Sequence, residues 1–242
     1  MNPEKEDAVN EVLAACGSKV KLCKGLGSTE MIGGATQSYN DCNQRGSAGI
    51  PLVKVDCGIF DFETGEEKKY GELGEICLSG PTLMLGYYKQ PEETEKVVRL
   101  HSDGRRWFHS GDIGYIDENG VLFVTGRVRR IIMTKGKDGN ATKLFPDRIE
   151  KVVNAHPAVK ASCVVGIPDK TRINYAKAYV ELNEGYAPSE KLAREICRSC
   201  QDMLPDYQIP DDGEFYPQMP RTERGKIDYR TLEKIAGEEQ KD

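Results

Sequence analysis

The protein has 242 residues, of which 38% are hydrophobic and 30% charged, and its formal net charge is −5. This length allows one large domain or two small ones, each with its own core. An acidic chain does not fit the class of nucleic-acid-binding proteins, whose domains are usually basic. No run approaches the ~20 apolar residues of a membrane span, and the acidic N-terminus lacks the apolar segment of a signal peptide. We therefore expect a folded, cytoplasmic protein with neither a nucleic-acid partner nor a membrane span.

The first half of the chain begins with a helical pattern and then becomes rich in strand patterns. Pro3 suits the first turn of a helix, Gly17 suits its end, and from Ile50 onward apolar residues recur with a period of two. The expected elements are a helix over residues 3–16, a strand over 19–23, a glycine-rich turn over 25–30, strands over 50–59 and 76–78, and a helix over 91–98.

The stretch WFHSGDIGYIDENGVLFVTGRVRR, residues 107–130, predicts a β-hairpin followed by a junction. Alternating residues flank a turn rich in Asp, Asn and Gly, which is typical of a hairpin. Asp112 stands between Gly111 and Ile113, where a side chain can be presented at the edge of the sheet. Gly126 and the three arginines after it combine backbone freedom with charge. We expect two domains to meet at this point.

The second half alternates between strand and helix patterns and predicts an α+β domain of about 115 residues, large enough to fold alone. Ser189 is a suitable N-cap for a helix that carries apolar residues at helical spacing. The expected elements are strands over residues 130–134, 161–167 and 176–182, and helices from 146, from 189 and from about 228.

Eight cysteines are scattered without regular spacing. The one close pair, Cys197 and Cys200, falls on a predicted helix, and no second pair completes a four-ligand zinc site. We expect reduced thiols, with redox or metal use of this pair as the alternative.

The glycine-rich turn places hydroxyl and carboxylate side chains next to each other. Gly27 is followed by Ser28 and Thr29, whose hydroxyls suit a phosphate oxygen, and by Glu30, whose carboxylate suits a divalent cation. The alternative is a polar surface turn without a ligand.

Two further residues could contact a ligand. Asp112 can accept two hydrogen bonds from ribose hydroxyls, although an Asp at this place could instead stabilise the turn. Lys226 follows a glycine in a loop and can extend a positive charge across a cleft, although a solvated surface lysine is the simpler interpretation.

Taken together and in order, these motifs resemble those of the adenylate-forming enzymes, the superfamily of AMP-forming acyl-CoA synthetases, carrier-protein adenylation domains and luciferases. The resemblance covers almost the whole chain and rests on six segments: GLGSTE from Gly25, GELGEICLSGPTLMLGYYKQPEET from Gly71, WFHSGD from Trp107, Gly126-Arg127, IPD from Ile167, and PRTERGKID from Pro220. It implies an α+β chain with three parts. These are the C-terminal remnant of a large α/β domain (residues 1–48), a β-rich, barrel-like subdomain (49–126) and a small mobile α+β lid domain (127–242).

The resemblance also implies roles in nucleotide binding. Gly27, Ser28 and Thr29 would form the phosphate-binding turn, with Thr29 on the α-phosphate, and Glu30 would hold Mg²⁺. Leu26 would lie against the adenine, where relatives often have an aromatic residue.

Four more roles follow from the same resemblance, two of them in nucleotide binding. Asp112 would hold the ribose hydroxyls, and Arg127 would contact the ribose or phosphate. Lys226 would be the catalytic lysine that stabilises charge while the adenylate forms, an effect commonly worth on the order of 10²–10³ in rate. Arg129 would be the hinge about which the lid domain turns before the thioester forms.

The chain departs from the pattern of the superfamily at two places. The phosphate-binding loop rich in Ser, Thr and Gly does not occur in these 242 residues. Residues 135–143, KGKDGNATK, lack the GxxxxGK[ST] order of a phosphate loop and are expected to form an inserted surface loop. Arg148 stands where relatives have a glutamate. The segment that contains the insertion and Arg148 helps to shape the CoA tunnel in relatives, so this departure concerns the thioester step.

These observations favour the C-terminal portion of an ATP-dependent acyl-CoA ligase, acting on a small-molecule carboxylate with ATP, Mg²⁺ and CoA and inactive alone because the phosphate-binding loop is missing. A separate N-terminal half is then a candidate partner. Two alternatives stay open, a noncatalytic remnant serving as an interaction module and part of a carrier-protein adenylation domain. The sequence does not identify the acyl substrate.

Overall fold

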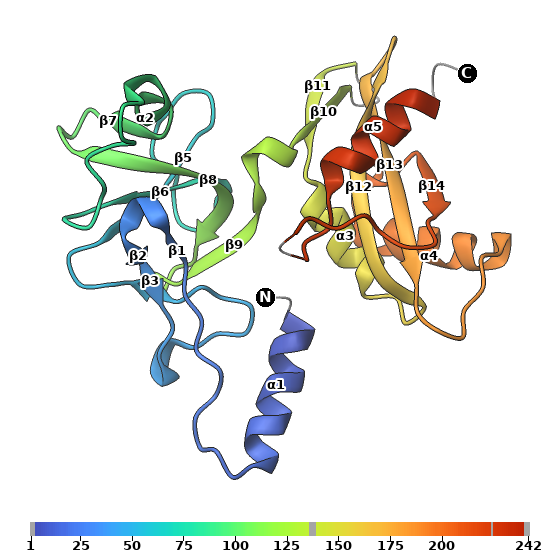
Figure 1. Ribbon diagram of the computed structural model, residues 1–242, viewed down its shortest axis with the longest axis horizontal. Coiled ribbons are helices and arrows are strands. Elements are labelled where there is room, and N and C mark those ends of the chain that lie inside the picture. The colour runs from blue at the N-terminus through green and yellow to red at the C-terminus, as the bar shows by residue number, and fades with distance from the viewer. Residues whose placement is uncertain (1–2, 136–138, 224, 240–242) are drawn as a thin grey trace. The chain divides into compact units, whose positions relative to one another are not determined.

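The computed structural model describes residues 3–135, 139–223 and 225–239. The chain divides into two compact units, one ending at Val128 and one beginning at Arg129 (Figure 1). The first unit contains α1 (Pro3–Ala15), β1 (Gly27–Ser28), β2 (Gly33–Gly34), β3 (Thr36–Gln37), β4 (Ile50–Pro51), β5 (Asp56–Phe60), β6 (Gly74–Ser79), α2 (Pro91–Val97), β7 (Val98–Leu100), β8 (Arg106–Ile116) and β9 (Leu122–Arg127). The second contains β10 (Ile132–Lys135), β11 (Ala141–Leu144), α3 (Pro146–Asn154), β12 (Val159–Asp169), β13 (Ile173–Leu182), α4 (Glu190–Met203), β14 (Asp212–Phe215) and α5 (Tyr229–Glu239).

The first unit is organised around the long strand β8. One edge of β8 pairs with β6, and the other edge pairs first with β7 and then with β9, giving a five-stranded sheet in the order β5-β6-β8-β7 with β9 beside β8. Ile76 and Leu78 of β6 pack with Phe108 and Leu122 in the core of this unit. The predicted hairpin is confirmed as β8 and β9. The expected barrel-like closure is absent among the described strands, since β5 at one edge of the sheet does not pair with β7 or β9 at the other.

The segment after α1 does not form the strand predicted over residues 19–23. Its backbone groups are satisfied by side chains from elsewhere: Leu22 donates its N–H to Asn10 Oδ1 at 2.7 Å, and Lys24 donates its N–H to Ser38 Oγ at 2.6 Å. The Lys24 ammonium also pairs with the buried carboxylate of Glu6 on α1. These contacts replace a strand ladder and tie the N-terminal helix to the rest of the unit.

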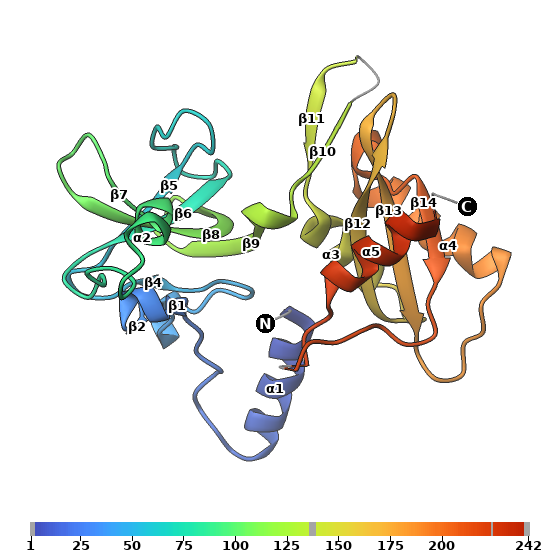
Figure 2. The same ribbon diagram turned by 45° about the horizontal axis from the view of Figure 1, so that its top comes forward.

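The second unit has a sheet with a hydrophobic core on each face. β12 and β13 pair antiparallel over almost their whole lengths, and β14 joins β13 in parallel. Val164 and Ala178 point into the core with α3 and α4, whereas Val165 and Tyr179 point into the core with α5. Figures 1 and 2 show α5 on one face of this sheet and α3 on the other. Both faces are covered, which explains the uninterrupted apolar run CVVGI over residues 163–167 of β12.

The helix signals of the second unit are confirmed. Pro146 occupies the first turn of α3, and Ser189 caps α4 by accepting a hydrogen bond from the Leu192 N–H at 3.2 Å. The strand predicted from residue 130 begins only at Ile132, after a 3-10 turn over Val128–Arg130. The predicted surface loop over 135–143 is partly a strand, since β11 pairs with β10, and residues 136–138 lie outside the described residues.

The described residues contain no helix that is long and apolar enough to cross a membrane. All eight cysteines lie within the described residues and are free thiols.

Candidate functional site

The glycine-rich turn is a tight two-strand hairpin. Gly27 faces Gly34 and Ser28 faces Gly33, with a 3-10 turn over Thr29–Met31 between the two strands. A Cβ atom on Gly27 would lie 2.3 Å from the Gly33 carbonyl oxygen, so a side chain does not fit there. Ser28 Oγ accepts a hydrogen bond from the Met31 N–H, and the Met31 side chain is fully buried. The buried Met31 side chain therefore anchors the turn, and Thr29 is exposed at its tip.

Glu30 keeps an ionised carboxylate on this turn. Its Oε1 accepts a hydrogen bond from the Tyr87 hydroxyl at 2.6 Å, and its carbonyl accepts one from the Met84 N–H at 2.8 Å. Burial alone would raise the pKa of Glu30, but the hydrogen bonds from Tyr87, the backbone and Ser28 outweigh burial and lower it. A carboxylate held in the charged form is a suitable ligand for a hard cation such as Mg²⁺.

Asp112 and Arg127 are brought together by the pairing of β8 with β9. They stand opposite each other in the ladder, and Asp112 Oδ1 lies 2.9 Å from Arg127 Nε. The Asp112 side chain is only 11% exposed, whereas that of Arg127 is 64% exposed. Because the arginine side of the pair is open to solvent, which weakens its attraction to the carboxylate, a ligand can replace the arginine at Asp112.

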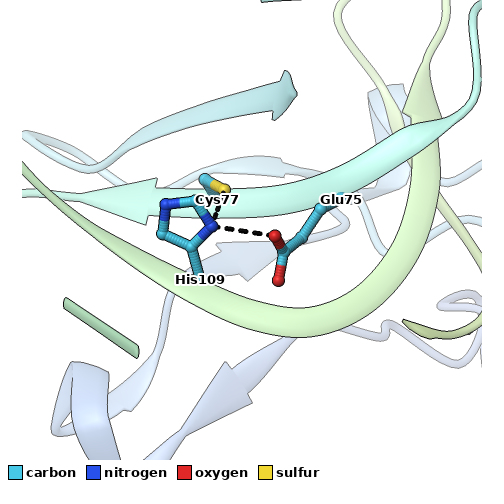
Figure 3. Close-up of side chains that lie close together, drawn as sticks. All are labelled: Glu75, Cys77 and His109. Carbon is cyan, nitrogen blue, oxygen red and sulfur yellow. Dashed lines mark hydrogen bonds and ion pairs between the residues drawn. The ribbon is translucent and has the colours of Figure 1, made fainter. Parts of the chain in front are cut away.

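Three neighbouring side chains, two of them buried and the third largely buried, were not singled out from the sequence. Glu75 and Cys77 of β6 and His109 of β8 point toward one another, as Figure 3 shows. One possible ligand atom from each of the three lies within 4.8 Å of the other two. His109 Nδ1 lies 2.8 Å from Glu75 Oε2 and 3.5 Å from Cys77 Sγ. Glu75 and Cys77 are two residues apart on one strand, so their shared face was readable, but the pairing with His109 required the register.

These three side chains are of the types that ligate transition metals, but their spacing is that of a hydrogen bond. Two ligands of a tetrahedral site with bonds of ~2.0–2.1 Å stand roughly 3.3 Å apart. The separation of 2.8 Å between His109 Nδ1 and Glu75 Oε2 is shorter than this and fits an N–H···O bond. Burial raises the pKa of the Cys77 thiol, which keeps this side chain neutral.

The remaining predicted residues belong to the second unit. Lys226 is exposed in a tight loop, in which its carbonyl accepts a hydrogen bond from the Thr222 N–H at 2.8 Å and Gly225 donates its N–H to the Thr222 carbonyl. Arg129 is exposed and is the first residue of this unit. The structure thus gathers the turn residues into one hairpin and joins Asp112 to Arg127, while Lys226 lies on the other compact unit.

Arg130, the residue after the predicted hinge, is fixed inside the second unit. Its guanidinium donates to Glu150 at 3.0 and 2.6 Å, to Asp147 at 3.3 Å and to the Val164 carbonyl at 3.1 Å. It also lies over the Tyr229 ring, 5.2 Å from its centroid. The arginines at 129 and 130 therefore differ, since one is exposed and the other is an internal anchor.

Comparison with known proteins identifies the same class as these motifs. A family model described as the AMP-binding enzyme matches residues 1–88, and one described as the AMP-binding enzyme C-terminal domain matches residues 148–226. A long-chain-fatty-acid–CoA ligase of Bacillus subtilis is 35% identical over 190 residues, covering 78% of this chain and 32% of that protein. The 2-succinylbenzoate–CoA ligase of Geobacillus kaustophilus is 31% identical over 232 residues, covering 94% of this chain and 44% of that protein.

A solved structure agrees with these relatives. The crystal structure of ATP-bound MatB from Rhodopseudomonas palustris matches with a TM-score of 0.77 and 28% identity, covering 90% of this chain and 41% of that one. Fold and motifs together are those of an enzyme class that activates carboxylates as adenylates. The chain belongs to the adenylate-forming superfamily of AMP-binding enzymes, and the predicted resemblance is confirmed. It spans less than half the length of these relatives.

Proposed function

We propose that this chain provides the C-terminal part of an ATP-dependent acyl-CoA ligase, which adenylates a small-molecule carboxylate and then forms a thioester with CoA. The observation that carries the proposal is the pair formed by Asp112 and Arg127: a nearly buried carboxylate held beside an exposed guanidinium. An ionised carboxylate can accept hydrogen bonds from both hydroxyls of a ribose, and an exposed guanidinium can contact the ribose or a phosphate. The match to an ATP-bound relative supports ATP or AMP as the ligand.

The glycine-rich turn supplies the other groups expected on the first unit. We assign Gly27, Ser28 and Thr29 to the nucleotide phosphate, because the turn exposes backbone and hydroxyl groups at its tip. We assign Glu30 to Mg²⁺, because its carboxylate stays charged. Magnesium bound there would neutralise phosphate charge during adenylate formation.

Two assignments concern the second unit. Lys226 would stabilise charge on the reacting carboxylate and α-phosphate, and Arg129 would be the hinge. Arg129 is the first residue of the second unit and directly precedes Arg130, which is fixed inside that unit. This position supports a hinge at Arg129.

A nucleotide titration followed by NMR tests the binding step. The ligand is an acyl-sulfamoyl adenosine, a stable mimic of the acyl-adenylate, added with Mg²⁺ to the purified chain and to Asp112→Asn. Loss of a hydrogen bond to a charged acceptor costs about 1.5–3 kcal/mol, so the variant should bind roughly ten- to a hundredfold more weakly. Glu118→Gln, an exposed acidic residue of the same hairpin, is the matched control and should bind as the wild type does.

The outcomes separate the interpretations. Equal affinity of wild type and Asp112→Asn would overturn the ribose assignment. An absence of wild-type binding at millimolar ligand would favour the noncatalytic interaction module instead. We expect no ATP–pyrophosphate exchange by this polypeptide alone, and we expect exchange restored by an N-terminal half to be abolished in Lys226→Ala.

A further inference from the structure

The Asp112 carboxylate is presented by a bulge in β8. Cys77 of β6 faces His109 of β8, and Glu75 faces Ile113, so a step of two residues on β6 is matched by a step of four on β8. The two extra residues fall within Ser110–Asp112. A bulge leaves backbone groups without ladder partners, and those groups need another partner when they are buried.

Side chains of the bulge and of β6 provide these partners. Ser110 Oγ accepts a hydrogen bond from the Asp112 N–H at 3.0 Å and donates one to the Ile76 carbonyl at 2.7 Å. The Gly111 N–H, which the bulge removes from the ladder, donates to Glu75 Oε1 at 3.1 Å. Gly111 has a φ of +69°, a conformation that favours glycine.

The Glu75 carboxylate is in turn held by His109. Its second oxygen lies 2.8 Å from His109 Nδ1, and the Glu75 side chain is only 15% exposed. The opposite ring nitrogen of His109 lies 3.0 Å from His101 Nε2. A proton on His109 Nδ1 satisfies both contacts, because Nδ1 then donates to Glu75 and Nε2 accepts from His101.

We infer that Glu75 and His109 are positioning residues for nucleotide binding. They fix the Ser110–Asp112 bulge so that the Asp112 carboxylate is aimed at the ribose, and neither contacts the nucleotide. The inference rests on the proposed ribose role of Asp112. It goes beyond that role because it assigns the orientation of the carboxylate to buried groups on β6 and β8.

The test uses a pair of ligands that differ only in the groups read by Asp112. AMP has both ribose hydroxyls, and 2′,3′-dideoxy-AMP has neither. Both are titrated by NMR into the wild-type chain, Glu75→Gln, His109→Ala and His109→Gln, with exposed Glu72→Gln as the matched control. We expect Glu75→Gln and His109→Ala to lose about tenfold in affinity for AMP and none for the dideoxy ligand. His109→Gln, whose amide can donate to Glu75, should recover most of the loss.

A second readout needs no nucleotide. The Gly111 amide should exchange with solvent at least tenfold faster in Glu75→Gln than in wild type, while amides of β12, which belongs to the second unit, keep their rates. Trp107 of β8 is buried, and its fluorescence shows whether each variant is folded.

The two proposals fail in different ways. If the wild type does not favour AMP over the dideoxy ligand, the ribose role of Asp112 fails, and the Gly111 exchange still decides whether Glu75 fixes the bulge. If the wild type favours AMP but the variants lose affinity for both ligands equally, or for neither, the positioning role is refuted. Unchanged Gly111 exchange in Glu75→Gln also refutes it.

Discussion

Replacing Arg130 by methionine removes the cation of a buried ion pair and keeps a side chain of similar length. The Arg130 and Glu150 side chains are only 14% and 13% exposed. Without the guanidinium, the Glu150 carboxylate keeps the Val164 N–H, at 2.7 Å, as a hydrogen-bond donor but loses the cation that pairs with it. Removing one partner of a buried pair costs about 3–5 kcal/mol. At roughly 4 °C per kcal/mol for a unit of this size, the midpoint temperature of thermal unfolding of the second unit should fall by about 12–20 °C.

The loss should depend on pH in a definite direction. Burial raises the pKa of Glu150 even in the wild type, where Arg130 opposes the rise. In Arg130→Met the pKa rises further, because the opposing cation is gone. A carboxyl whose pKa is raised by folding destabilises the folded state once pH exceeds its unfolded pKa, and the penalty disappears when the group is protonated in both states. The loss of stability in Arg130→Met, relative to the wild type, should therefore be larger near pH 7.5 than near pH 5.

Urea unfolding of the full chain, followed by far-UV circular dichroism and by hydrogen exchange of β12, measures the change in the free energy of unfolding of the second unit. Trp107 is the single tryptophan and lies in the first unit, so its fluorescence follows that unit separately. The double variant Arg130→Met/Glu150→Gln is the control, since glutamine still accepts the Val164 N–H and carries no charge. A loss below about 1 kcal/mol in the single variant, the level of a surface pair, would refute the reasoning. So would a double variant no more stable than the single one.

Two further predictions concern the glycine-rich turn and the thiols. Gly27→Ala should destabilise the first unit by about 1–3 kcal/mol, measured by urea unfolding followed by Trp107 fluorescence. Gly34→Ala should destabilise it less, because its Cβ would meet only Leu52 Cδ1 at 3.5 Å. Equal effects of the two substitutions would contradict the close approach of Gly27 to Gly33. In the folded chain, iodoacetamide should modify the exposed Cys16 and Cys197 before Cys163. Cys163 is buried, and its burial raises the pKa of its thiol to about 12. Mass spectrometry that finds Cys163 modified first would disprove its inaccessibility.

Elements with strong local signals could be predicted from the sequence. α4 follows from the Ser189 cap and apolar residues at helical spacing, and the hairpin of β8 and β9 follows from its alternation and its Asp-Asn-Gly turn. The segment over residues 19–23 has a short strand-like pattern, yet distant side chains such as Asn10 and Ser38 satisfy its backbone. Local pattern carries no information about such partners.

The candidate site was predictable only in part for the same reason. Gly27, Asp112 and Lys226 stand in ordered motifs, so the resemblance found them. Glu75 and His109 are ordinary strand residues in isolation, and the register in which β6 pairs with β8 brings them together. A two-residue bulge changes which side chains face each other, and single-sequence reasoning does not fix that register.

The two-faced sheet of the second unit has a consequence for how its sequence can diverge. Met219 and Ile227, at either end of the loop that carries Lys226, pack with α5 on one face, while α3 and α4 close the core on the other. Substitutions among the residues under α5 can therefore shift the lysine loop without opening the opposite core. During divergence, residues on the α5 face can change the position of Lys226, while residues on the face covered by α3 and α4 keep the opposite core stable.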